Sequence, residues 1–137
     1  MDRVEKVKLL LDTHIWIWAT ASPEKLSPRV RRELQRATNE LYLSPVSIWE
    51  ERYLERRKRL RTKPDFSQWL ERVLLQVPLG EAPFTFAVAV SASQVELPES
   101  DLGDVFLAAT ALTLGLTLVT ADTQLLDCSG LKTLSND

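Results

Sequence analysis

The stretch Asp101–Asp122, which reads DLGDVFLAATALTLGLTLVTAD, gives the clearest indication of the fold of this 137-residue chain. The part from Asp101 to Leu114 has the character of a helix, and Gly115 stands where helices commonly end. The apolar, partly β-branched run Leu116–Thr120 then predicts a buried strand, and Asp122 follows that strand closely. A helix that leads at once into a buried strand is typical of proteins in which helices cover a parallel sheet.

The rest of the chain shows the same alternation of short strands and helices. We predict strands at Val7–Leu11, Leu41–Ser44 and Lys132–Leu134, a brief strand at Val77–Leu79, and helices at Pro28–Ala37, Val46–Arg59, Phe66–Gln76 and Phe84–Gln94. Ser27 is expected to cap the first of these helices. The pattern predicts an α/β fold with a parallel sheet and helices on both of its faces. Ligands of such sheets collect beyond the carboxyl ends of the strands.

Length and composition indicate a single domain over residues 1–137. Hydrophobic residues make up 45% of the chain and charged residues 26%, the balance of an ordinary globular protein. There is no internal repeat, low-complexity tract or Gly/Ser linker. One cysteine, Cys128, and one histidine, His14, exclude a disulfide framework and a Cys/His zinc site.

The sequence predicts no membrane span. Its longest uncharged run, Val105–Ala121, has 17 residues, fewer than the ~20 apolar residues that a spanning helix needs. The basic residues near the start precede no apolar segment long enough for a signal peptide. A single cysteine is compatible with a reducing compartment, so we expect a cytoplasmic protein.

Acidic residues occur where the predicted strands end. Asp12 ends the first strand, Asp122 follows a late strand, and Glu50 lies early in the helix after the second strand. Asp101 and Asp104 are three residues apart at a predicted helix start, so they share one face. We therefore expect these carboxylates to gather at the ligand-binding edge of the sheet.

Carboxylates that converge on one edge repel one another unless a cation neutralises them. Oxygen ligands without His or Cys favour Mg²⁺ or Mn²⁺, and such ions commonly serve phosphoryl chemistry. Thr120 could orient a carboxylate or a metal-bound water. Each acid taken alone also fits a turn or a helix cap, and one of Glu50 and Glu51 is expected to be solvated, so the hypothesis depends on the combination.

Basic residues are concentrated in the segment Arg52–Lys63. This segment contains seven basic residues and one acidic residue, Glu55, which leaves 10 basic and 18 acidic residues elsewhere, a net charge of −8. Such segregation can create one positive surface on an acidic body. Contact of this surface with a nucleic acid, with a protein partner or with solvent alone remains open.

The single histidine, three tryptophans and the single cysteine are weighed as further site residues, and the sequence favours a role outside catalysis for each. His14 follows the first strand, and a supporting role is favoured over that of a general base. Trp16, Trp18 and Trp49 could stack on bases, but their apolar surroundings favour packing in the core or at an interface. Cys128 has no neighbouring His or Cys, which argues against a nucleophile.

Four segments together resemble the PIN-domain family, and within it the VapC-type ribonuclease toxins of type II toxin–antitoxin systems. These segments are Leu10–Trp16, Ser44–Glu50, Asp101–Asp104 and Leu116–Asp122. They occur in the order of the family, and the resemblance covers Leu9 to about Leu134. Two departures stand out: the family often has Asp-Pro-Phe-Asp where this chain has Asp101–Asp104, and the segment Glu51–Arg56 is more charged than usual.

The resemblance implies a three-layer α/β/α fold, Mg²⁺- or Mn²⁺-dependent RNA cleavage and inhibition by a cognate antitoxin. By motif position, Asp12, Glu50, Asp104 and Asp122 would be the acidic quartet, with Thr120 as the supporting hydroxyl and Asp101 beside the quartet. Asp12 and Asp104 would be the principal metal ligands, and the other two acids would hold a second ion or order water. A homodimer is expected as well. If the chain cleaves RNA, as the resemblance implies, we predict that the basic segment binds the RNA backbone through Arg52, Arg56, Arg57 and Arg59.

Two rival functions remain open. A phosphoacceptor signalling module also gathers acids and Mg²⁺ at strand ends, but it needs a lysine after a late strand. Here Ala121-Asp122-Thr123 follows that strand, and the only later lysine is Lys132. A catalytically silent RNA- or protein-binding domain is the third possibility, and the complete acidic quartet argues against it.

Overall fold

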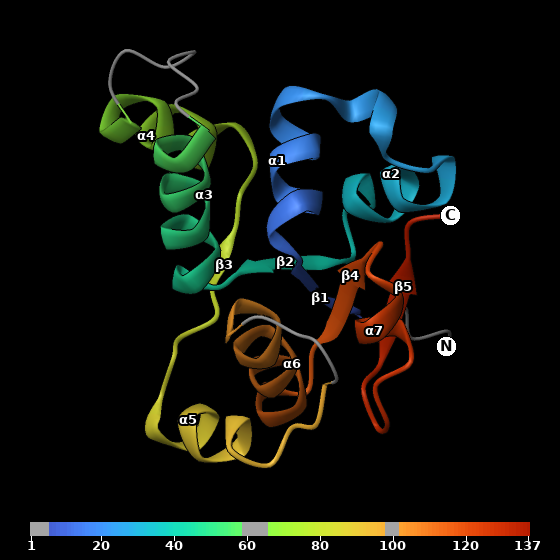
Figure 1. Ribbon diagram of the computed structural model, residues 1–137. Helices are drawn as coiled ribbons and strands as arrows, with labels where there is room; N and C mark the ends of the chain where they lie inside the picture. Colours follow the sequence, from blue (N-terminus) through green and yellow to red (C-terminus); the bar gives the residue numbers. More distant parts are fainter. Residues whose placement is uncertain (1–5, 59–65, 98–101) are drawn as a thin grey trace, which may run out of the picture.

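The computed structural model describes residues 6–58, 66–97 and 102–137 (Figure 1). The first half of the chain forms β1 (Lys8–Leu11), α1 (Thr13–Ala21), the short 3-10 helix η1 (Pro23–Lys25), α2 (Pro28–Gln35), β2 (Glu40–Leu43), α3 (Pro45–Lys58) and α4 (Phe66–Gln76). The second half forms β3 (Gly80–Glu81), α5 (Phe86–Ala92), α6 (Leu102–Leu114), β4 (Thr117–Thr120), α7 (Thr123–Leu126) and β5 (Thr133–Ser135).

The five strands form one sheet in the order β3-β2-β1-β4-β5, and every neighbouring pair is parallel. In the centre, Leu10 of β1 is aligned with Tyr42 of β2 on one side and with Leu118 of β4 on the other. From β1 the chain adds β2 and then β3 on one side, and it then crosses back and adds β4 and β5 on the other side of β1. The strand order therefore reverses beside β1, the position at which parallel sheets commonly bind ligands.

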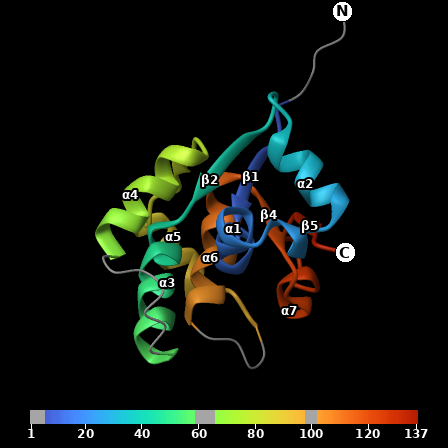
Figure 2. The ribbon, with the colours of Figure 1, turned by 90° about the horizontal axis from the view of Figure 1, so that it is seen from above.

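Two separate cores cover the two faces of the sheet, as the alternation of side chains along β1 requires. Leu9 and Leu11 face one core, which includes residues of α1, α2 and α4, whereas Leu10 faces the other core, built by α6 and α7. Figures 1 and 2 show α1, α2 and α4 on one side of the sheet and α5 and α6 on the other. The predicted α/β fold, with a parallel sheet between layers of helices, is confirmed.

The helix ends follow the expected capping rules. Ser27 precedes α2, and its Oγ accepts a 3.1 Å hydrogen bond from the backbone N–H of Val30. Thr85 caps α5 in the same way, so this helix begins two residues later than the predicted start at Phe84. Gly115 ends α6 with a φ of +69°, the left-handed conformation predicted for it.

The strand predicted at Val77–Leu79 is wrong, because the short strand lies just after it at Gly80–Glu81. Gly80 pairs with Tyr42, and a Cβ at position 80 would lie 2.7 Å from Cε1 of that tyrosine. The close approach of the ring therefore requires glycine, a residue that argues against a strand in the sequence. Among the residues that the structure describes, no helix has the length and apolar character needed to cross a bilayer.

Candidate active site

Asp12 lies at the carboxyl end of the central strand and links β1 to α1. Its backbone N–H donates to the carbonyl of Val119 in β4, and its own carbonyl accepts the N–H of Trp16 in α1, both at 3.0 Å. Although Asp12 occupies the N-cap position of α1, its side chain makes no capping bond. Asp12 is only 7% exposed, and contacts other than helix capping hold its carboxylate at the edge of the sheet.

Thr120, at the end of β4, holds this carboxylate in place. Its hydroxyl donates a 2.6 Å hydrogen bond to Oδ2 of Asp12 and accepts a 3.0 Å bond from the backbone N–H of Asp122. Asp122 in turn caps α7, because its Oδ1 accepts a 2.8 Å bond from the N–H of Gln124. One oxygen of Asp122 thus has the capping role that the sequence left open.

Glu50 is positioned by a hydroxyl from the neighbouring helix. Oγ1 of Thr13 in α1 lies 2.7 Å from Oε1 of Glu50 and 2.9 Å from Oγ of Ser47, both in α3. A hydroxyl has one proton, and an ionised carboxylate can only accept, so the Thr13 hydroxyl donates to Glu50. The Ser47 hydroxyl then donates to Oγ1 of Thr13. Thr13 and Ser47 are both buried, which fixes this connection between α1 and α3.

The first turn of α6 approaches Glu50 from the other side. A Cβ at Gly103 would lie 2.6 Å from Cδ of Glu50, so the carboxylate lies directly against the backbone of this turn. A carboxylate is favourable beside a helix N-terminus, where backbone N–H groups carry partial positive charge. Asp104 follows in the same turn and is half-buried.

The four carboxylates of the predicted quartet line one cavity of about 390 Å³. Its lining consists of Asp12, Thr13, His14, Trp18, Glu50, Asp104, Ala121 and Asp122. The four carboxylates come from four segments that are far apart in the sequence: the ends of β1 and β4, the first half of α3 and the first turn of α6. In the described parts of the chain, no three Asp, Glu, His or Cys side chains already stand at the spacing of a metal site.

Burial governs the electrostatics of this cavity. The pKa of Asp12 is raised above its ordinary value, chiefly because the buried carboxylate loses its contact with water. The hydrogen bond from Thr120, the charge of His14 and the backbone of Thr13 lower the pKa by less, and the charge of Asp122 raises it further. The cavity therefore favours a positive charge beside Asp12.

Some predicted site residues are not placed by the structure. Asp101 and Arg59 lie outside the described residues, and so do the side chains of Arg56 and Arg57. Arg52 is described: it is exposed on α3, two residues after Glu50, and does not line the carboxylate cavity. The predicted RNA-binding role of the four arginines is untested.

Several residues differ from the expectations of the sequence. Thr13 was not singled out, although its place directly after Asp12 in a strand-to-helix turn is a signal for a site hydroxyl. His14 is exposed and lines the cavity, a position that leaves its expected supporting role untested. One of Glu50 and Glu51 was expected to be solvated, but Glu50 is half-buried and Glu51 is only 6% exposed. Trp49 is 63% exposed and so does not pack in the core.

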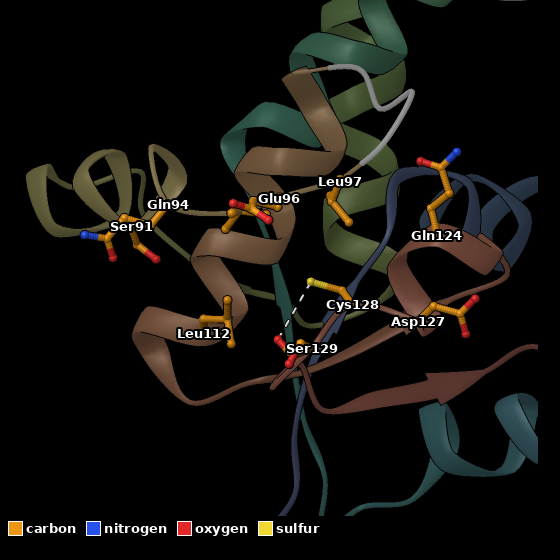
Figure 3. Close-up of a pocket in the computed structure, with 10 residues that line it drawn as sticks. Ser91, Gln94, Glu96, Leu97, Leu112, Gln124, Asp127, Cys128 and Ser129 are labelled. Atoms are coloured by element: carbon orange, nitrogen blue, oxygen red, sulfur yellow. Dashed lines mark hydrogen bonds between the residues drawn. The ribbon is translucent and has the colours of Figure 1, made fainter.

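The lone cysteine lies elsewhere, in a separate hollow of about 610 Å³ between α5, the end of α6 and the loop after α7 (Figure 3). Cys128 contacts the carbonyl of Ser129, and partial burial raises the pKa of its thiol. A thiol with a raised pKa is a poor nucleophile at neutral pH, in agreement with the sequence argument against a nucleophilic Cys128. None of the four carboxylates lines this hollow.

Comparison with known structures gives the fold independently. The complex of VapBC2 from Rickettsia felis with a promoter DNA fragment superimposes with a TM-score of 0.75 at 19% identity, covering 96% of this chain and 100% of that one. DNA-bound VapBC from Salmonella typhimurium gives 0.65 at 18% identity, over 96% and 99% of the two chains. FitAcB from Neisseria gonorrhoeae gives 0.61 at 22% identity, over 93% and 97%.

The sequence comparisons identify the family. The chain is 31% identical to Ribonuclease VapC22 of Mycobacterium tuberculosis over 121 residues, which cover 85% of this chain and 88% of that relative. The family model described as PIN domain matches residues 9–131, a range that includes all four carboxylates of the cavity. The resemblance inferred from the four sequence motifs is thereby confirmed, and this chain belongs to the PIN-domain family.

Proposed function

We propose that this chain is a metal-dependent endoribonuclease and the toxin of a toxin–antitoxin pair. The observation that carries the proposal is the convergence of Asp12, Glu50, Asp104 and Asp122 on one cavity at the point where the strand order reverses. The 31% identity to a protein named as a ribonuclease supports the choice of RNA as substrate.

The donors of the cavity fit a divalent cation by their chemistry. All four acidic groups offer hard oxygen ligands, and burial of Asp12 makes a neighbouring cation favourable. We assign Asp12 and Asp104 as principal ligands of Mg²⁺ or Mn²⁺, and Glu50 and Asp122 as ligands of a second ion or of an ordered water. When bound, the cation would activate water and stabilise the charge that develops on the phosphodiester.

The surrounding hydroxyls act as positioning groups. Thr120 fixes the rotamer of Asp12 through its 2.6 Å bond, and Thr13 fixes Glu50 through its 2.7 Å bond. The Thr120 hydroxyl also accepts the backbone N–H of Asp122, so one hydroxyl contacts both Asp12 after β1 and the turn that carries Asp122 after β4. These contacts keep the carboxylates aligned so that attack on the phosphodiester needs little further reorganisation.

The rival assignment as a phosphoacceptor module receives no support from the cavity. Such a module needs a lysine that contacts the phosphoryl group. The side chains that line the cavity, within the described ranges, include His14 but no lysine.

We further propose that residues 1–137 act as one domain, in the cytoplasm, as a homodimer that a cognate antitoxin holds inactive. The support for a partner is that solved structures of the same fold include complexes entitled VapBC and FitAcB. Because a free ribonuclease would damage the cell's own RNA, expression of the chain alone should arrest growth. Harmless, high-yield expression of the unmutated chain would contradict this.

One experiment tests the activity. Purified protein is incubated with total cellular RNA in Mg²⁺, with and without EDTA, and new 5′ ends are mapped. We expect cleavage that EDTA abolishes and that Asp104→Asn abolishes without loss of the fold, as judged by circular dichroism. Equal cleavage by Asp104→Asn and the wild type would show that the site is wrongly assigned.

A further inference from the structure

A third hollow, which we call the aromatic groove, lies between α3 and the start of α6. It has a volume of about 650 Å³ and is lined chiefly by Trp49, Tyr53, Leu102 and Phe106, together with Glu50 and Gly103. Glu50 lines the carboxylate cavity as well, so the two hollows share one wall. The aromatic groove therefore adjoins the proposed active site.

The outer wall of the groove is a stacked pair of rings. Trp49 and Tyr53 are four residues apart on α3 and therefore lie on one face of the helix. Their ring centroids are 5.2 Å apart, and the ring planes meet at 14°. Trp49 is 63% exposed and Tyr53 is 44% exposed, so a flat aromatic surface faces water beside Glu50.

The groove also exposes aliphatic surface. Leu102, at the start of α6, is 71% exposed and faces the same hollow. Large apolar side chains that gather in one exposed hollow mark a binding surface more often than scattered ones do. Folding alone therefore does not account for the apolar character of the groove.

We propose that the aromatic groove binds one unpaired base of the RNA substrate, next to the phosphodiester that is cut, by stacking on Trp49. The proposal rests on the proposed ribonuclease function. Base–aromatic stacking needs a flat exposed ring and tolerates any base, since every base has a π-face. The groove would hold the strand in position while the carboxylates supply the chemistry.

The position of the groove favours RNA over a protein occupant. A strand whose phosphate lies among the carboxylates has its neighbouring nucleotide beside Glu50, where the groove begins. Arg52 is exposed on α3 within one turn of both rings, and its charge complements the phosphates of that strand.

The test uses the Asp104→Asn background, so that RNA is bound without being cut. The probe is a short single-stranded RNA that spans a cut site mapped with the wild-type protein. Its dissociation constant is measured for the parent, for Trp49→Leu and for Phe86→Leu, a matched exposed aromatic outside the groove that is 94% exposed. The same RNAs carry an abasic nucleotide at each position flanking the cut.

We expect Trp49→Leu to weaken binding by about tenfold or more, and Phe86→Leu to leave it unchanged. An abasic nucleotide at one of these positions should lower the affinity of the parent by a similar factor. It should not lower the affinity of Trp49→Leu further, because both changes remove the same stacking contact. Both variants should unfold at the temperature of the parent, since neither side chain is buried.

Four results would overturn the proposal. The first is an equal dissociation constant for the parent and for Trp49→Leu. The second is a loss of affinity from the abasic nucleotide that adds fully to the loss from Trp49→Leu. The third is a change in the molar mass of the protein, measured by light scattering, in Trp49→Leu. The fourth is a loss of antitoxin binding with no loss of RNA binding. Either of these two results would make the groove a protein interface. A wild-type protein that cuts no RNA would instead contradict the proposed function itself, so the two failures are distinguishable.

Discussion

The hydroxyl of Thr120 and the carboxylate of Asp12, 108 residues apart in the sequence, are joined by a 2.6 Å hydrogen bond. Both residues are buried, and they stand at the ends of adjacent parallel strands, β4 and β1. A hydrogen bond to a buried charged group is among the stronger ones in proteins, because the unpaired charge is costly to bury. The pair therefore couples the architecture of the sheet to the chemistry of the cavity.

Thr120→Val should destabilise the protein by about 1–3 kcal/mol at neutral pH, because the nearly isosteric side chain leaves Asp12 without its donor. Affinity for Mg²⁺ should fall by roughly 10- to 100-fold, the usual cost of losing a group that orients a metal ligand. Urea unfolding and metal titration measure the two effects. The matched control is Thr110→Val, which removes a buried hydroxyl bonded only to the backbone of Phe106. Unchanged metal affinity in Thr120→Val, or an equal loss in the control, would contradict the prediction.

Asp12→Asn should make the metal-free protein more stable than the wild type at neutral pH. Burial raises the pKa of Asp12 in the folded state above its value of about 3.9 in the unfolded chain. The folded state therefore binds this proton more tightly. The contribution of Asp12 is fully present below the unfolded pKa and is lost as the pH rises through the folded pKa.

Urea unfolding in EDTA, from about pH 3 to pH 7, measures this difference between Asp12→Asn and the wild type. It should grow with pH and shrink when Mg²⁺ is added, because only the aspartate attracts the cation. A difference that does not change with pH would show that Asp12 is charged at no cost in the folded protein.

Gly103→Ala should reduce RNA cleavage while preserving the fold. The added Cβ would lie 2.6 Å from Cδ of Glu50, so the carboxylate must move. Alanine is favoured over glycine in a helix by roughly 1 kcal/mol, which offsets part of the crowding in unfolding measurements. A double-mutant cycle with Glu50→Ala isolates the cause: Gly103→Ala should have no further effect on kcat once the carboxylate is gone. An equal loss in both backgrounds would mean that Gly103 acts through something other than Glu50.

Replacing Arg52 with Gln should flatten the salt dependence of RNA binding, with the slope of log K against log salt falling by about 0.7 if the guanidinium contacts one phosphate. The triple variant of Arg56, Arg57 and Arg59 to Gln should lower the slope by about 2, three times that amount. Single-turnover cleavage at saturating RNA should change little. The measurements use protein without antitoxin, and an unchanged slope would leave contact with a partner or with solvent as the role of these arginines.

The sequence predicted the positions that depend on strand ends better than those that depend on helix faces. Asp12 and Asp122 could be placed because the carboxyl ends of parallel strands meet at one edge of a sheet. The exposure of Trp49 could not, because an apolar residue on a helix looks the same in sequence whether it fills a core or lines a groove. The burial of Glu51 could not be predicted either, because charge alone does not show which of two neighbouring glutamates faces inward. The position of Thr13 indicates a site hydroxyl, but its contact with Glu50 depends on how α1 packs against α3, which the sequence does not show.

The three consecutive leucines of β1 have a consequence for folding. Leu9, Leu10 and Leu11 fill both faces of the sheet with the same side chain, so apolar packing alone distinguishes poorly between the native pairing and one shifted by a residue. Such a shift would carry Asp12 away from Thr120 and break their hydrogen bond. The polar end of the strand therefore selects the pairing that the leucines leave ambiguous, and a chain that has mispaired β1 has no assembled cavity. The protein can therefore form the carboxylate cavity, and any activity that depends on it, only in molecules whose central strand is correctly paired.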